Sequence, residues 1–368
     1  MKPVLFATGH APAYRVGALQ RLHEREHIEL ALFGGRARHA GARAAGELAL
    51  PHRHVRPREL AALAASGEYR AVVIPTGGRL APLAGWAGAR RARVPVILWA
   101  SLWAHPRSAA HALTYLPLRR LYRSADAVVT YGPHVSRYVR AHGARNVHVA
   151  PQAVDNDFWS APVRAAPSAA RWPRDAQLRF LFAGRAAREK GLAVLLRAWA
   201  EAELAPRAAL VLAGVGPELH LSGELLPAAR AGFREGVTCL EPVEPLELRT
   251  LYAHSDALVL PSIPTRTFRE PWGLVVNEAM NRALPVIASD AVGAAAGGLV
   301  RDGANGLVVP AGASAALARA LRLLADDAKL RARLGSAGAR DVRAFSYDAW
   351  AAGFSQALHT LGVSRERW

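Results

Sequence analysis

Short apolar runs, bounded by glycine, proline or charge, alternate with segments of helical periodicity along the first 150 residues. The runs predict strands at Pro3–Gly9, Ile28–Gly34, Tyr69–Pro75, Val94–Ala100 and Ala127–Gly132. Helices are predicted between most of them, for example at Arg15–Arg25, Arg58–Ser66 and His134–His142. Apolar strands that alternate with helices are typical of a parallel sheet covered on both faces.

A second series of the same kind begins after a stretch rich in Pro, Ala, Ser and Arg at residues 161–176, which is the predicted linker. Its strands are predicted at Leu178–Gly184, Ala209–Gly214, Val237–Glu241, Ala257–Pro261 and Leu284–Asp290. Its helices are predicted at Gly191–Ala202, Pro245–His254, Trp272–Arg282 and Ser314–Asp326. The sequence therefore predicts two α/β, Rossmann-like, doubly wound domains that face each other across a cleft. Ligands of such sheets bind beyond the carboxyl ends of the strands.

The composition of the 368 residues supports two folded domains, because 51% of them are hydrophobic. The single cysteine, Cys239, excludes an intramolecular disulfide and a thiolate metal cluster. No apolar run reaches the roughly 18 residues of a membrane-spanning helix, and the N-terminus leads directly into a strand. The expected location is the cytoplasm, with a peripheral association at the inner face of the membrane left open.

The charge is concentrated in the first half of the chain. Residues 1–150 hold 22 Lys and Arg against 7 Asp and Glu, a net charge of +15. The remainder holds 25 against 22, or +3, which completes the net charge of +18. This excess favours an anionic partner, such as a phospholipid surface, a lipid phosphate, nucleic acid or an acidic glycan. The alternative is a coding bias toward arginine, since only three of the 47 basic residues are lysine.

The segment from Arg269 to Met280 combines two glutamates with a predicted helix start. Pro271 suits the first turn of a helix that continues to Arg282. Glu270 is then expected at the mouth of this helix and Glu278 on its body, about 12 Å away along the axis. This separation suits one elongated ligand, and the backbone amides between the two glutamates are expected to face a diphosphate. The alternative is an ordinary amphipathic helix with an acidic N-terminus.

The loop after the strand at Leu178–Gly184 carries two cations. Arg185 follows the strand and Lys190 opens the next helix. Two positive charges here are suited to a pyrophosphate leaving group, which other enzymes neutralise with a divalent metal. A solvated loop of mixed charge is the alternative. A further glycine turn, at Gly214-Val215-Gly216, follows the next strand and has little specificity alone.

Taken in order, these segments resemble the family-4 retaining glycosyltransferases of the GT-B fold. The resemblance is dense from Leu178 to Leu323. It includes the loop with Gly184, Arg185 and Lys190, the turn at Gly214, Ser255–Ser262, the glutamate pair, Ala283–Asp290 and Asp302–Val308. The resemblance implies an N-terminal acceptor-binding domain at residues 1–160 and a nucleotide-sugar-binding domain at residues 177–347. A C-terminal helix at about residues 348–362 is expected to cross back to the first domain.

The resemblance implies transfer of a hexosyl group from a UDP- or GDP-sugar to an acceptor hydroxyl, with retention of configuration and with neither cofactor nor metal. Glu270 would contact the donor sugar and Glu278 the ribose. Arg185 and Lys190 would neutralise the diphosphate. The backbone of Gly184, Gly214, Gly273, Leu274 and Val275 would complete the donor-binding site.

The first half departs from the family pattern. The usual double-glycine loop after the first strand is replaced by a segment that contains Gly9 and Arg15, which are the candidates there for donor contact. The usual histidine after the fourth or fifth strand is replaced by Ser101, and His105 is the candidate substitute. An anionic or lipid-linked acceptor is expected on this basic half, and a cytoplasmic small-molecule acceptor is the alternative.

Other functions remain as alternatives. A sugar-nucleotide epimerase shares the fold but not the run from Arg269 to Met280. A phosphorylase would need a lysine for pyridoxal phosphate, and only Lys190 among the three lysines lies near the predicted site. A basic nucleic-acid- or anion-binding protein without catalysis would agree with the charge, although no helix-turn-helix, zinc finger or aromatic stacking motif is present.

Overall fold

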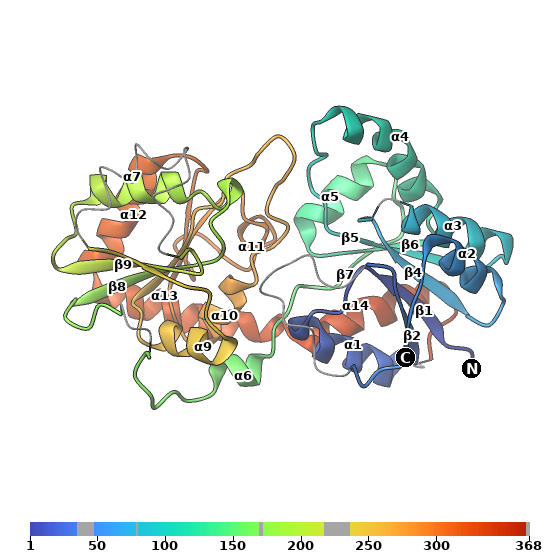
Figure 1. Ribbon diagram of the computed structural model, residues 1–368, viewed down its shortest axis with the longest axis horizontal. Helices are drawn as coiled ribbons and strands as arrows, with labels where there is room; N and C mark the ends of the chain where they lie inside the picture. Colours follow the sequence, from blue (N-terminus) through green and yellow to red (C-terminus); the bar gives the residue numbers. More distant parts are fainter. Residues whose placement is uncertain (35–47, 79, 169–171, 217–235, 366–368) are drawn as a thin grey trace. The chain divides into compact units, whose positions relative to one another are not determined.

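The computed structural model describes residues 1–34, 48–78, 80–168, 172–216 and 236–365, and the chain divides into two compact units (Figure 1). Unit 1 comprises residues 1–155 and the C-terminal segment that begins at residue 345, and unit 2 comprises residues 156–344. Each unit contains its own parallel sheet. The prediction of two doubly wound α/β domains is confirmed.

The sheet of unit 1 has seven strands in the order β3-β2-β1-β4-β5-β6-β7. Their bounds are Val4–Thr8 (β1), Ile28–Leu32 (β2), His52–His54 (β3), Ala71–Pro75 (β4), Val96–Ala100 (β5), Ala127–Thr130 (β6) and Val147–Val149 (β7). Every residue of β1 and of β6 is buried. Because both faces of these strands are apolar, helices must cover the sheet on each side.

The helices of unit 1 form two layers around this sheet (Figure 1). They are α1 (Ala13–Glu26), α2 (Pro57–Ala65), α3 (Ala81–Arg91), α4 (Ala109–Ser124), α5 (Pro133–Ala141) and α14 (Tyr347–Thr360). One layer holds α1 and the C-terminal helix α14, whose Trp350 and Phe354 pack on Phe6 of β1. The other holds residues of α2 to α5. The C-terminal segment is thus part of the core of unit 1.

The sheet of unit 2 has six parallel strands in the order β10-β9-β8-β11-β12-β13. Their bounds are Leu178–Ala183 (β8), Ala208–Ala213 (β9), Val237–Leu240 (β10), Ala257–Leu260 (β11), Val286–Ser289 (β12) and Leu307–Val309 (β13). The helices are α6 (Asn156–Ser160), α7 (Leu192–Ala202), α9 (Pro245–Ala253), α10 (Val275–Asn281), α11 (Gly293–Ala296), α12 (Ser314–Asp326) and α13 (Ala328–Asp341). Helices α7 and α12 share one apolar core with β8 and β9. The order of strands reverses between β8 and β11, which is where such sheets bind ligands.

The predicted helix Trp272–Arg282 is wrong at its N-terminal end. Helix α10 begins at Val275, so Pro271 lies outside it. Gly273 has a φ of +93°, and a Cβ there would lie 2.7 Å from Leu260 Cδ2, so this residue turns the chain where the helix was expected. The buried indole of Trp272 donates a hydrogen bond of 2.8 Å to Asn277 Oδ1. Tertiary packing of the turn therefore prevails over the preference of proline for the first helical turn.

Candidate active site

Three loops of unit 2 meet at the carboxyl ends of β9, β8 and β11. Gly184 follows β8 and its N–H donates to the carbonyl of Ala213 at the end of β9, over 2.9 Å. A Cβ on Gly214 would lie 3.0 Å from the carbonyl oxygen of Gly184, so the two turns are in contact. Ser262 follows β11 and is fully buried. The sequence-predicted Gly184 and Gly214 are therefore adjacent, at the carboxyl ends of β8 and β9.

The loop that carries Lys190 is fixed against the end of β11. A single 3-10 turn covers Arg188–Lys190, and Gly191 follows with a φ of +71°. A Cβ on Gly191 would overlap the carbonyl group of Pro261. The carbonyl oxygen of Glu189 accepts a 2.9 Å hydrogen bond from the N–H of Ile263. These contacts require glycine at position 191 and hold the start of α7 beside β11.

Lys190 and Glu270 form the central contact of the site. Lys190 Nζ lies 2.6 Å from Glu270 Oε2, and the two side chains are 17% and 9% exposed. The hydroxyl of Ser262 donates to the same carboxylate oxygen over 3.3 Å. An ammonium group carries three donors and this ion pair uses one of them. The arrangement fixes a carboxylate that can accept hydrogen bonds next to a cation that can face an anion.

Ser262 is itself held in place, because its carbonyl oxygen accepts a hydrogen bond from the hydroxyl of Ser289 at the end of β12. Both serines are buried. Nothing in their spacing pointed to a role at the site. Ser262 lies in the Ser255–Ser262 segment of the resemblance and directly follows a predicted buried strand, but neither signal assigned it a contact with Glu270.

Arg185 lies on the same loop but in a different contact. Its guanidinium pairs with Glu189, and its side chain is 69% exposed whereas that of Glu189 is 16% exposed. The structure thus places Arg185 and Lys190 on one loop. Of these two cations, Lys190 pairs with Glu270 and Arg185 pairs with Glu189.

Glu278 lies on α10 beside α9. Its carboxylate accepts a 2.8 Å hydrogen bond from the hydroxyl of Tyr252, a fully buried residue of α9. Burial raises the pKa of Glu278 to about 7, although the Tyr252 hydrogen bond acts in the opposite direction. The sequence identified Glu278 and missed Tyr252. Leu274 directly precedes α10 and Val275 is its first residue, so both lie about one helical turn before Glu278.

The predicted site residues of unit 1 lie at the carboxyl end of its sheet and in the segment after β5. The carbonyl oxygen of Gly9, after β1, accepts a 2.9 Å hydrogen bond from Gly34 N–H. His105 is in hydrogen-bond contact with the carbonyl oxygen of His111 over 2.9 Å and packs edge-on against the Tyr115 ring. Its contact with a donor stays a prediction.

Arg15 is 5% exposed and is held inside unit 1. One guanidinium nitrogen donates to Gln152 Oε1, and the guanidinium carbon lies 5.4 Å from the ring centroids of both Trp99 and Trp350. Arg15 therefore joins α1 to β5 and α14. Gln152 was not identified from the sequence.

The comparisons with known proteins agree with this geometry. Residues 170–341 match the model of the family described as glycosyl transferases group 1. The chain is 33% identical over 303 residues to D-inositol 3-phosphate glycosyltransferase of Xylanimonas cellulosilytica, and the alignment covers 76% of this chain and 70% of that protein. The chain belongs to the glycosyl transferases group 1 family. It is therefore a glycosyltransferase, as the sequence predicted.

Solved structures show the fold of this glycosyltransferase. A sucrose-phosphate synthase from Thermosynechococcus elongatus has a TM-score of 0.76 at 21% identity, and the alignment covers 98% of this chain and 99% of that one. Anabaena HepE in complex with UDP and glucose has a TM-score of 0.74 at 20% identity, with 98% and 100% covered. The fold is GT-B.

Two further properties concern the described residues. None of their helices combines the length and the hydropathy that are needed to cross a bilayer. Within the same part of the chain, no group of three or more His, Cys, Asp or Glu side chains is arranged to hold a metal ion.

Proposed function

We propose that this glycosyltransferase moves a hexosyl group from a nucleoside diphosphate sugar, UDP- or GDP-linked, to an acceptor hydroxyl with retention of configuration, as in family 4. The contact between Lys190 and Glu270 carries the proposal. It places a cation and an oriented carboxylate side by side at the carboxyl ends of β8 and β11, where a doubly wound sheet binds a nucleotide. The Anabaena structure with UDP and glucose supports a donor of this class.

The charged groups have three roles in this proposal. Lys190 and Arg185 offset the charge that develops on the diphosphate as it leaves. Glu270 accepts hydrogen bonds from sugar hydroxyls and so orients the anomeric carbon. Glu278 accepts from the ribose hydroxyls. Gly184, Gly214, Gly273, Leu274 and Val275 line the donor with backbone rather than with side chains.

The reaction replaces one bond of the anomeric carbon by another. The bond to the diphosphate oxygen breaks, and a bond to the acceptor oxygen forms on the same face. The acceptor proton passes to the departing phosphate oxygen, so no separate base is required. Glu270 is then a positioning group and not a nucleophile. Because Lys190 and Arg185 supply the positive charge, we propose that no divalent metal is needed.

We further propose an anionic acceptor that binds to unit 1. The +15 balance of residues 1–150 supports it. The name of the Xylanimonas relative, which refers to a phosphorylated inositol, supports it as well. A panel of soluble phosphorylated acceptors and of the same head groups on lipid, each beside its neutral analogue, distinguishes the free from the lipid-linked form. Equal transfer to neutral and anionic acceptors would contradict this part.

Donor use is tested with a panel of UDP-, GDP- and dTDP-sugars, read by thermal shift and by slow donor hydrolysis. At least one donor is expected to raise the melting temperature and to be hydrolysed. Lys190→Met is expected to abolish both effects. Lys329→Met removes an exposed lysine of unit 2 outside the site and is the matched control. The proposal fails if no donor binds, or if both variants bind a donor equally well.

A further inference from the structure

Helix α4 of unit 1 presents apolar side chains to solvent. Leu113 is 81% exposed and Leu116 is 68% exposed. Ala109, Ala112 and Pro117 are exposed on the same helical face, since the five positions follow the three- and four-residue spacing of one stripe. The opposite face is anchored in the core by the buried Leu121 and Tyr122. The apolar stripe is therefore an outward-facing feature of a helix that is already packed.

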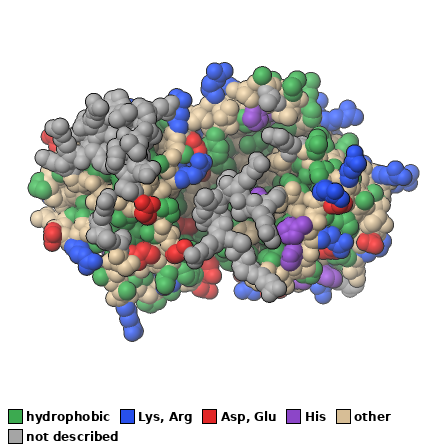
Figure 2. All heavy atoms as spheres, viewed as in Figure 1, with side chains coloured by type: hydrophobic (Ala, Val, Ile, Leu, Met, Phe, Trp, Pro, Cys, Tyr) green, Lys and Arg blue, Asp and Glu red, His purple; other side chains and the backbone are tan. Residues whose placement is uncertain are grey.

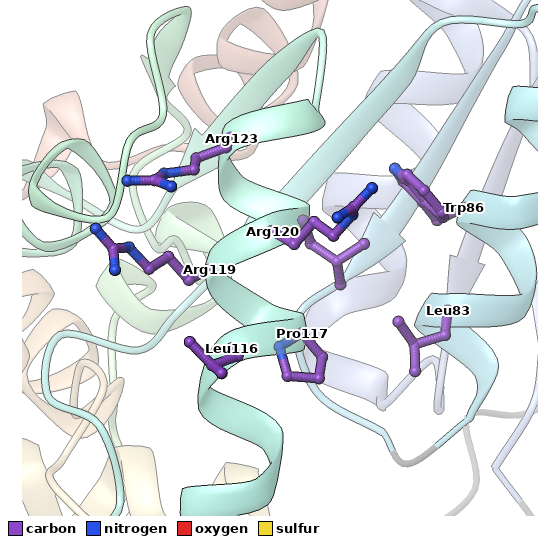
Figure 3. Close-up of a pocket in the computed structure, with 8 residues that line it drawn as sticks. Leu83, Trp86, Leu116, Pro117, Arg119, Arg120 and Arg123 are labelled. Carbon is purple, nitrogen blue, oxygen red and sulfur yellow. The ribbon is translucent and has the colours of Figure 1, made fainter.

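Helix α3 extends this apolar surface. Leu80, directly before α3, is 65% exposed, and Leu83 within it is 40% exposed. A pocket of about 670 Å³ opens between the two helices. Figure 3 shows Leu83 and Trp86 on its α3 side and Leu116 and Pro117 on its α4 side. We call the exposed side chains of α3 and α4 the α3–α4 surface; such contiguous apolar exposure marks an interaction site.

Arginines surround the α3–α4 surface. The apolar stripe of α4 continues on the same face into the exposed Arg120 and Arg123. In Figure 3, Arg120 reaches toward Trp86, whereas Arg119 and Arg123 extend to the other side of α4. The sequence from residue 69 to residue 125 contains nine arginines and no Asp or Glu. Figure 2 shows hydrophobic side chains beside basic ones on the part of the surface formed by α4.

We propose that the α3–α4 surface docks onto an anionic lipid bilayer. The leucines of α4 would enter the boundary between head groups and acyl chains, and the arginines would contact lipid phosphates. Charge complementarity favours this partner over a second copy of the chain, because the surface carries no acidic side chain to pair with its own arginines. The inference does not depend on the proposed donor or acceptor chemistry.

Co-sedimentation with vesicles tests the proposal. The full chain is expected to sediment with vesicles of phosphatidylcholine mixed with phosphatidylglycerol at low salt. Binding is expected to weaken at high salt and to be absent with phosphatidylcholine alone, because screening and removal of the anionic lipid both weaken the arginine contacts. Absence of binding to the anionic vesicles at low salt would overturn the proposal. Equal binding to the neutral vesicles would overturn it too.

Two double variants of α4, each matched by a control double variant of unit 2, locate the contact. L113Q/L116Q is expected to lower the vesicle partition coefficient at least tenfold, by roughly the cost of keeping two leucines out of the bilayer. L246Q/L323Q changes two leucines of unit 2 that are 60% and 46% exposed, and it is expected to bind as the wild type does. R120Q/R123Q is expected to lower partition by about 30-fold, and R197Q/R319Q, which removes two exposed arginines of unit 2, is expected to have little effect. If the control pairs lose as much binding as the α4 pairs, the surface assignment is wrong.

A second copy of the chain is the alternative occupant. Sedimentation velocity without lipid would then detect a dimer that L113Q/L116Q dissociates, and that result would overturn the bilayer proposal. Donor hydrolysis by unit 2 is measured on the same preparations. If the chain hydrolyses a donor but does not bind vesicles, only the docking proposal is contradicted. If the chain binds vesicles but uses no donor, only the proposed function is contradicted.

Discussion

Lys190 Nζ lies 2.6 Å from Glu270 Oε2, and 80 residues of sequence separate them. The ion pair joins the 3-10 turn before α7 to the segment after β11, and both side chains are largely buried. Removal of either partner takes the opposite charge away from a largely buried group, which is strongly unfavourable. The pair is therefore both a structural connection and the proposed centre of the donor site, and the two roles can be separated by mutation.

Lys190→Met is expected to lower the free energy of unfolding by about 3–5 kcal/mol, because it removes the cation that pairs with the buried Glu270 carboxylate. Adding Glu270→Gln should recover part of this loss, since the amide carries no charge. The double variant should nevertheless be less active than Glu270→Gln alone if Lys190 acts on the diphosphate. Urea unfolding and donor turnover of both single variants and the double variant measure this. The Lys329→Met control is expected to stay within about 0.5 kcal/mol of the wild type.

Gly191→Ala is expected to damage the site more than a typical glycine substitution. The positive φ alone costs roughly 1–2 kcal/mol for an L residue, and the new Cβ would also collide with the Pro261 carbonyl group. Gly303→Ala is a matched control, because Gly303 has a φ of +67° but nothing within 4 Å of an added Cβ. Thermal melting and kcat/KM for donor hydrolysis should both fall further in the first variant. Equal losses in the two would show that the Pro261 contact is unimportant.

Arg185→Ala is expected to separate binding from stability. Its ion pair with Glu189 involves an arginine side chain that is 69% exposed, so the melting temperature should hardly change. If Arg185 contacts the leaving diphosphate, kcat/KM should fall by about 100-fold, as for other groups that stabilise charge in a transition state. Arg266→Ala, at an exposed position of unit 2, is the control. If turnover is unchanged in Arg185→Ala, Arg185 is a solvated residue of the loop and does not act in the reaction.

The elements of the fold are predictable because each depends on local pattern. Buried strands such as β1 and β11 appear as continuous apolar runs between glycine or charged residues, and the alternation with helices implies parallel sheets. The start of α10 was mispredicted because its determinants are tertiary. The positive φ of Gly273 and the bond from Trp272 to Asn277 depend on neighbours that the local sequence does not reveal.

The site was predictable only in part, for the same reason. The charged loop after a strand indicated Lys190, and the predicted helix start after Arg269 indicated Glu270 and Glu278. Neither pattern indicated which of these residues are in contact. The partners Tyr252 and Ser262 lie on other elements, and the sequence pattern assigned no contact to either of them. Likewise, the periodicity of α4 indicates an apolar face but not that this face points outward. The outward orientation is evident only from the structure, where Leu121 and Tyr122 on the opposite face of α4 pack in the core.

The raised pKa of Glu278 predicts how stability depends on pH. Burial raises this pKa from 4.5 to about 7 in the folded chain, so the folded state binds more protons than the unfolded state between these values. The contribution of Glu278 to the stability of the folded state is therefore fully present below pH 4.5 and is lost as the pH rises through 7. The loss is at most about 3 kcal/mol from the size of the shift. Melting curves of the wild type and of Glu278→Gln, which cannot titrate, should diverge across this range.

The same pKa predicts how the donor binds, and Tyr252 provides the test. If Glu278 accepts hydrogen bonds from the ribose hydroxyls as proposed, it does so better as a carboxylate than as a carboxylic acid, so KM for the donor should fall as the pH rises through about 7. Tyr252→Phe removes the hydrogen bond that lowers the pKa of Glu278, so the inflection of KM should move to higher pH. Glu278→Gln should show no inflection. If Tyr252→Phe does not shift the pH at which KM inflects, another group titrates. Glu278 would then have no part in ribose binding.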